Sequence, residues 1–126
     1  MRRSRCMGLV LLILPVVLSI LACSHEASPG SILSHQQIVE IANQQAVSEG
    51  FNPAEMDVLC ESGNRTWRRV LRLSRTDPGK AKHFSVLDGR NYQAVRYSPK
   101  QVMLGGVLWV FVDRHTGEVI TWYGEE

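Results

Sequence analysis

Residues 107–112 of this chain read Val107-Leu108-Trp109-Val110-Phe111-Val112, an uninterrupted apolar run. Because both odd and even positions are apolar, the pattern is typical of a central strand that is buried on both faces. Gly105 and Gly106 precede the run, and the segment Asp113-Arg114-His115-Thr116-Gly117 follows it. We expect a turn there, in which Gly117 supplies a positive φ and Asp113 caps the turn amides, and then a last strand over residues 118–123.

Upstream of this hairpin, the clearest signal is that of a helix. Ser34 and Gln37 have the spacing of a capping box, and Gly50 stands where a left-handed C-cap is expected. The residues at spacings of three and four between these caps form one narrow stripe: Ile38, Ile41, Ala42, Gln45 and Ala46. Asn52 and Pro53 repeat the start signal and predict about one further helical turn.

After Met56 the pattern favours strands. We interpret residues 56–61 and 66–74 as an antiparallel hairpin around a turn at 62–65. In the second strand Trp67, Leu71 and Leu73 would share a face with Arg69, while Val70 would share the other face with Arg68 and Arg72.

The rest of the chain is interpreted as a loop and one more strand. Residues 76–90 are polar, with turn signals near both ends, and residues 92–97 resume the strand pattern. The sequence therefore predicts an α+β domain over residues 34–126, in which one N-terminal helix packs on an antiparallel sheet of about five strands and the opposite face stays open.

The N-terminus has the pattern of a secretory signal. Arg2, Arg3 and Arg5 precede an apolar run that ends near Cys23, and this run is too short for an ordinary transmembrane helix. The stretch Ile20-Leu21-Ala22-Cys23 resembles the lipobox of bacterial lipoproteins, although Leu21 stands where Ala or Ser is commoner. This resemblance implies a signal peptide at 1–22 and a diacylglycerol on Cys23. The alternative is a cleaved secretory peptide with an incidental cysteine.

Lipidation of Cys23 would place the protein in the bacterial cell envelope, anchored to a membrane. We favour the periplasmic face, and the outer membrane over the inner one. Residues 23–33 would then be the lipidated cysteine and a flexible tether, because they are polar and contain Pro and Gly.

The net charge of the mature chain limits the classes of partner that we expect. Three of the 14 basic residues lie in the signal segment, which leaves 11 against 12 acidic ones, a formal net charge of about −1. We therefore expect no nucleic-acid partner.

The cysteine content excludes an internal disulfide. After removal of the signal peptide and lipidation of Cys23, Cys60 would be the one free cysteine, so it has no partner for a disulfide within the chain. A small buried hydrophobe is the favoured role for Cys60, against a reactive thiol or an intermolecular bridge.

The sequence offers no constellation for catalysis. The four histidines have no ligand spacing with cysteines or carboxylates, and Asp113 with His115 is explained by a capped turn. The carboxylates lie on different predicted elements, and no nucleophile elbow is present. We expect a protein that is not an enzyme, with no metal and no cofactor.

One basic cluster could bind a partner. Its candidate residues are Arg65, Arg68, Arg69, Arg72 and Arg75, followed by Lys80 and Lys82. A solvated face that protects the sheet from aggregation is one explanation, and a docking surface for the carboxylates or phosphates of an anionic partner is the other. Four aromatic residues could add anchors if they face the open side, although such residues are more often core: Trp67, Tyr92, Tyr97 and Trp122.

Several segments resemble known families. Ile41-Ala42, the corner Gly50-Phe51-Asn52-Pro53, the isolated Trp67, and Leu104-Gly105-Gly106 leading into residues 112–119 are similar to small secreted bacterial domains of the PepSY type and to NTF2-fold immunity proteins. The resemblance covers residues 35–123. The PepSY type implies a helix on a curved antiparallel sheet and a role in inhibition or binding. The immunity proteins imply neutralisation of a delivered toxin. Neither has catalytic residues to carry over.

These observations predict a lipid-anchored, non-catalytic module that binds or inhibits a macromolecular partner, most simply a protein. The alternatives are an immunity protein that neutralises a toxin and, third, an enzyme of unrecognised type.

Overall fold

The structure is a computed structural model, and it describes residues 30–125. These residues form three helices and four strands. Their bounds, in chain order, are α1 His35–Ser48, β1 Met56–Leu59, α2 Arg65–Ser74, α3 Pro78–Phe84, β2 Tyr92–Pro99, β3 Val107–Asp113 and β4 Val119–Glu125. Two short 3-10 turns complete the list, η1 Pro53–Glu55 and η2 Ser85–Leu87. The α+β class is confirmed, but the predicted single helix and five strands are wrong in number.

The four strands form one antiparallel sheet in the order β1-β2-β3-β4. The apolar run is β3, with Val110 opposite Val95 of β2 on one side and opposite Trp122 of β4 on the other. The predicted positions of β2, β3 and β4 are therefore confirmed. The turn after β3 is also as expected, because Gly117 has φ 73° and Asp113 accepts hydrogen bonds from the turn amides.

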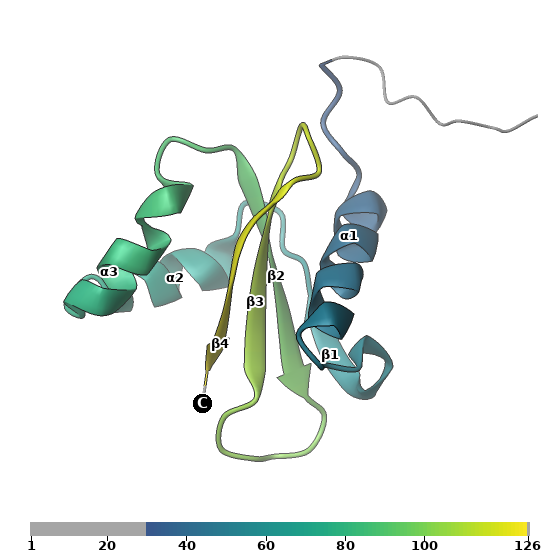
Figure 1. The fold of residues 1–126 in the computed structure, drawn as a ribbon, viewed down its shortest axis with the longest axis vertical. Coiled ribbons are helices and arrows are strands. Elements are labelled where there is room, and N and C mark those ends of the chain that lie inside the picture. The colour runs from purple at the N-terminus through teal and green to yellow at the C-terminus, as the bar shows by residue number, and fades with distance from the viewer. Residues whose placement is uncertain (1–29, 126) are drawn as a thin grey trace, which may run out of the picture.

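Helices cover both faces of this sheet (Figure 1), with α1 on one side and α2 and α3 on the other. The prediction of an open face is wrong. The sequence of β3 is incompatible with an open face. Its odd and even side chains are both apolar, so the side chains on both faces must be removed from water.

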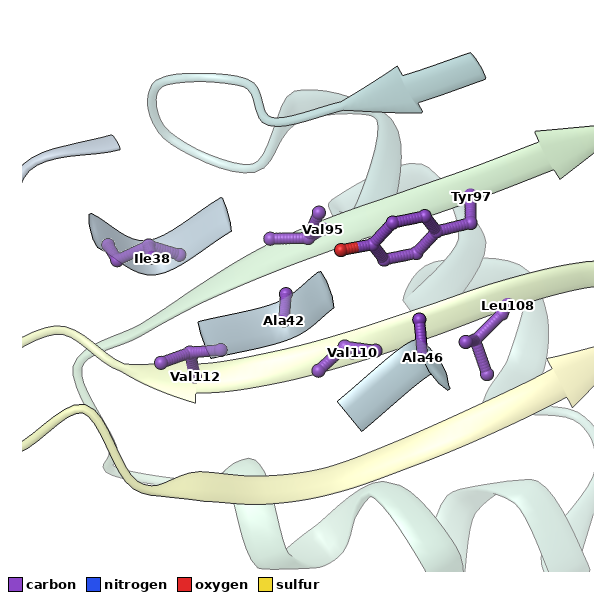
Figure 2. Close-up of a cluster of buried hydrophobic side chains, with 8 residues drawn as sticks. All are labelled: Ile38, Ala42, Ala46, Val95, Tyr97, Leu108, Val110 and Val112. Atoms are coloured by element: carbon purple, nitrogen blue, oxygen red, sulfur yellow. The ribbon is translucent and has the colours of Figure 1, made fainter. Parts of the chain in front are cut away.

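The first core lies between α1 and the sheet (Figure 2). Ile38, Ala42 and Ala46 are almost fully buried and meet five side chains from β2 and β3, namely Val95, Tyr97, Leu108, Val110 and Val112. Both alanines are small, so the helix backbone can approach the sheet closely. The expected caps are confirmed, because the Gln37 amide donates to Ser34 Oγ at 3.2 Å and Gly50 has φ 87°.

The second core is aromatic and lies on the opposite face. It consists of Trp67 from α2, Phe84 and Leu87 from the α3 region, and Ala94, Trp109 and Phe111 from the sheet. The Trp67 ring lies at centroid distances of 4.8 Å from Phe84, 5.2 Å from Trp109 and 4.5 Å from Phe111. Its indole N–H donates to the Tyr92 hydroxyl at 2.9 Å, so its polar atom is satisfied.

Residues 66–74, predicted as a strand, belong to helix α2. The period-two interpretation put arginines on the same face as apolar residues. With a helical period the two kinds separate, because Trp67, Val70, Leu71 and Ser74 fall on one side. The helix buries Trp67 and Ser74 and half-buries the other two. The strand count drops from five to four for this reason.

Residues 76–90, predicted as a long connection, contain α3 and η2. The Asp77-Pro78-Gly79 signal is a helix start, not a turn: Asp77 Oδ1 accepts from the amides of Gly79 at 3.0 Å and Lys80 at 3.2 Å, and Pro78 occupies the first turn. Asn52 and Pro53 begin η1 in the same way, as expected, with Asn52 Oδ1 accepting from Ala54.

The predicted signal peptide at 1–22 and the lipidation site Cys23 lie outside the described residues. Just before α1, the Leu33 amide donates to the carbonyl oxygen of Arg114 at 2.8 Å and so attaches this segment to the β3–β4 turn. Among residues 30–125, no helix is long and apolar enough to cross a membrane.

Candidate functional site

The five candidate arginines gather on one side of α2. Arg68, Arg69 and Arg72 lie three, four and seven residues after Arg65, and Arg75 is the C-cap residue of the same helix. All five side chains are exposed. The structure therefore brings the predicted residues together, on a helix and not on a strand of an open sheet, and we call this surface the arginine face.

The arginine face points to solvent because the opposite side of α2 is anchored. Trp67 is fully buried in the aromatic core, and the Ser74 hydroxyl is satisfied by the carbonyl of Val70 at 2.9 Å. Because α2 has one buried side and one charged side, its guanidinium groups lie outside the core.

Asn64 attaches the start of α2 to β2. Its Nδ2 donates to the Tyr92 carbonyl at 3.0 Å, and its Oδ1 accepts from Gln93 Nε2 at 2.8 Å and from the Ala94 amide at 2.9 Å. Asn64 adopts φ 53°, the one non-glycine residue with a positive φ among the described residues. With its side chain used in this way, Asn64 is the N-cap residue of α2 but makes no capping hydrogen bond through its side chain.

A carboxylate from outside the helix takes over the capping. Glu61 Oε2 accepts from the Thr66 amide at 2.7 Å. The hydrogen bonds from Thr66 hold the pKa of Glu61 below its usual value, and the positive charge of Arg65 adds to the effect.

Apart from Glu61, on whose carboxylate Arg65 acts, the arginine face carries little compensating charge. The ion pairs within residues 30–125 join Arg90 to Asp113 at 3.2 Å and to Glu118 at 2.9 Å, and no arginine of the face takes part in one. Asp77, the acid nearest in sequence, is occupied at the start of α3.

The other members of the basic cluster lie on a different helix. Lys80 and Lys82 are exposed on α3, where Lys80 Nζ lies 5.8 Å from the centroid of the Tyr123 ring. This cation–π contact points Lys80 toward β4.

The candidate aromatic anchors are mostly part of the structure's interior. Trp67 and Tyr97 are fully buried, so neither can meet a partner. Tyr92 is half-buried beneath α2, with its hydroxyl bonded to Trp67. Trp122 of β4 is 40% exposed and remains available for contact.

Asp113 performs the turn-capping role that the sequence predicts. Its Oδ1 accepts from the amides of His115 and Thr116, both at 2.9 Å. These two hydrogen bonds, with help from Arg90, lower its pKa to about 2. The structure shows no group of three His, Cys, Asp or Glu side chains that could hold a metal ion among residues 30–125.

Cys60 directly follows β1 and packs half-buried against the core beneath α1. Burial raises the pKa of its thiol, and the positive charge of Arg114 offsets part of that rise. A raised pKa leaves little thiolate at neutral pH, which favours the role of a small hydrophobe over that of a reactive thiol.

An apolar loop projects from the far end of the sheet. Val102 and Leu104 are fully exposed and Met103 is 63% exposed. The loop borders a hollow of about 720 Å³ between the ends of α1 and β2, which Met103 helps to line. Leu104 belongs to a segment quoted above for its family resemblance, but no functional role was predicted for this loop.

Sequence reasoning also missed Arg90 and Arg114. Both side chains lie near the start of α2, on segments that are distant in sequence. No local pattern signals this arrangement, because it is created by the pairing of β2 with β3.

Comparison with family models, with curated proteins and with solved structures finds no match for this chain. The resemblance to PepSY-type domains and NTF2-fold immunity proteins therefore stays a prediction.

Proposed function

We propose that this protein is a non-catalytic binding module, held at the bacterial cell envelope by a lipid on Cys23, that docks on an acidic surface of a partner protein through the arginine face. The observation that carries the proposal is the gathering of five exposed arginines on one side of a helix. None of these five arginines forms an ion pair within residues 30–125. Guanidinium groups bind carboxylates in a bidentate way, which suits such a surface to an acidic partner.

The distribution of charge supports docking over simple solubility. Arg65 with Arg69, and Arg68 with Arg72, are like-charged pairs one helical turn apart, and each such pair costs a helix about 0.2–0.5 kcal/mol. A face that only needed water could carry mixed charges at no such cost. A partner's carboxylates would relieve the repulsion and so add to the affinity.

An apolar side chain lies beside this face. Leu73 is 70% exposed and follows Arg69 by one helical turn. Docking would remove Leu73 from water and so add apolar contact to the charge pairing of the arginine face.

Charge reversal of Arg69 and Arg72 to Glu tests the proposal. Both are exposed, so the fold should keep its melting temperature, while capture of the partner from solubilised envelope should fall by at least about tenfold and lose its salt dependence. The matched control reverses Lys80 and Lys82 on α3, which changes net charge by the same amount. An equal loss of capture by both variants, or no loss by either, would contradict docking through the arginine face.

A toxin-neutralising protein would be the same kind of module with a toxin as its acidic partner. Identification of the captured protein therefore tests this alternative in the same experiment.

A further inference from the structure

A hollow opens between the start of α2 and the β3–β4 turn, beside the arginine face. Its volume is about 410 Å³, and its lining residues come from three separate segments: Gly63, Asn64, Arg68, Arg90, Asn91, Tyr92 and Arg114. Three of these residues are arginines, and none is acidic. The tertiary structure thus concentrates positive charge in a concave site.

Two of the three arginines are not neutralised. Arg114 donates from Nε to the Tyr92 carbonyl at 3.1 Å and from Nη2 to Gln93 Oε1 at 2.7 Å, and both acceptors are uncharged. Arg68 has no ion pair or side-chain hydrogen bond within residues 30–125. The third arginine, Arg90, is held by the carboxylates of Asp113 and Glu118.

The site is held in place before any ligand arrives. Gln93, which fixes Arg114, is fully buried and donates from its own Nε2 to the Glu61 carbonyl and to Asn64 Oδ1, each at 2.8 Å. An arginine has five N–H donors, and these two bonds leave three of them on Arg114 for a ligand. Because its orientation is already fixed, little conformational entropy is lost on binding.

Gly63 allows a close approach to Arg68. A Cβ atom added at Gly63 would lie 3.2 Å from Arg68 Nη2, so the guanidinium group lies against bare backbone. The positive φ of Gly63, 76°, also favours glycine there.

We propose that this hollow binds a phosphate group carried by a small molecule. Two unpaired guanidinium groups match the charge of a phosphate dianion better than that of a single carboxylate, and their planar forks match its oxygens. The hollow holds many times the roughly 30 Å³ of a water molecule, so part of the attached molecule also fits. The proposal does not depend on docking through the arginine face, although Arg68 borders both.

The test is a titration of the full chain in detergent micelles with inorganic phosphate at constant ionic strength, followed by nitrogen-15 NMR. We expect saturable shifts at the amides of Gly63 and Asn64. Arg68→Ala should weaken phosphate binding at least about tenfold, because a charge-assisted hydrogen bond is lost. The control Arg72→Ala removes the same charge from the same helix outside the hollow and should change the affinity by less than about twofold.

Arg114→Lys gives a second, independent readout. Lysine keeps the positive charge but lacks the planar guanidinium fork, so we expect phosphate binding to weaken by about three- to tenfold. The melting temperature should also fall, because the bonds to the Tyr92 carbonyl and to buried Gln93 are lost. If this variant is unfolded, the comparison of Arg68→Ala with Arg72→Ala decides the question.

Three further probes identify the source of the anion. Glycerol phosphate should bind at least as tightly as inorganic phosphate, and acetate at least about tenfold more weakly. Absence of saturation, equal weakening by Arg72→Ala, or equal binding of acetate would overturn the proposal. Binding to phosphatidylglycerol vesicles without binding of free phosphate would also overturn it and assign the hollow to a membrane surface. Reversal of Arg69 and Arg72 spares the hollow, so failure of partner docking and failure of phosphate binding are distinguishable.

Discussion

Trp67 of α2 lies against Trp109 of β3, with the two ring centroids 5.2 Å apart. This contact attaches the arginine-bearing helix to the centre of the sheet. Since Trp67 is fully buried, the side of α2 that faces away from it must carry the arginines into solvent. One tryptophan pair therefore sets both the second core and the direction of the arginine face.

Replacement of Trp67 by Ala should destabilise the protein by about 3–5 kcal/mol, through lost transfer energy and the cavity left among the aromatic rings. The measurement is the free energy of unfolding from urea denaturation. Leu73→Ala is the control, because this side chain is 70% exposed on the same helix and should cost less than about 0.5 kcal/mol. Similar losses for the two variants would show that Trp67 is not a core residue.

Gly117→Ala should cost about 1–3 kcal/mol. Its φ of 73° is unfavourable for a residue with a Cβ atom, which would also lie 3.0 Å from Ile41 Cδ1 and 3.3 Å from Leu33 Cδ1. Thermal melts check this, with Gly124→Ala as the control, because an added Cβ there meets nothing within 4 Å. A melting temperature for Gly117→Ala equal to that of the control would contradict the strained turn.

Stability should fall on acidification between about pH 4 and pH 2, in part because of Asp113. Its pKa is about 2 in the folded protein and near 3.9 when unfolded, so only the unfolded state takes up the proton over this range. The stabilisation is present above the unfolded value and is lost as pH falls through the folded one. Urea midpoints of the wild type and of Asp113→Asn should therefore converge by about pH 2, and a constant gap between them would exclude this contribution.

Replacement of Cys23 by Ser should abolish lipid attachment and signal processing. We expect palmitate labelling to disappear and the apparent mass to increase, because the signal segment is retained. Cys60→Ser serves as the control and should keep its label. Unchanged labelling of the Cys23 variant would show that the lipid is attached elsewhere.

Local signals predicted the elements whose caps and turns are encoded by neighbouring residues. Ser34 with Gln37 and Gly50 mark both ends of α1, and Asp113 with Gly117 shape the β3–β4 turn, so each could be recognised from a few adjacent positions. In α2 the local signals conflict, because alternating apolar and basic residues fit a strand in part. The segment is a helix because a helix buries Trp67 and leaves every arginine in water, whereas a strand would place arginines on the same face as Trp67.

The sequence alone determined the α+β class, the central apolar strand, helix α1 and the grouping of the arginines, because these depend on periodicity and on contacts between near neighbours. The tertiary structure decided that both faces of the sheet are covered and that Arg68, Arg90 and Arg114 line one hollow. Those three arginines lie on separate segments, and only the pairing of β2 with β3 and the burial of Trp67 bring them together.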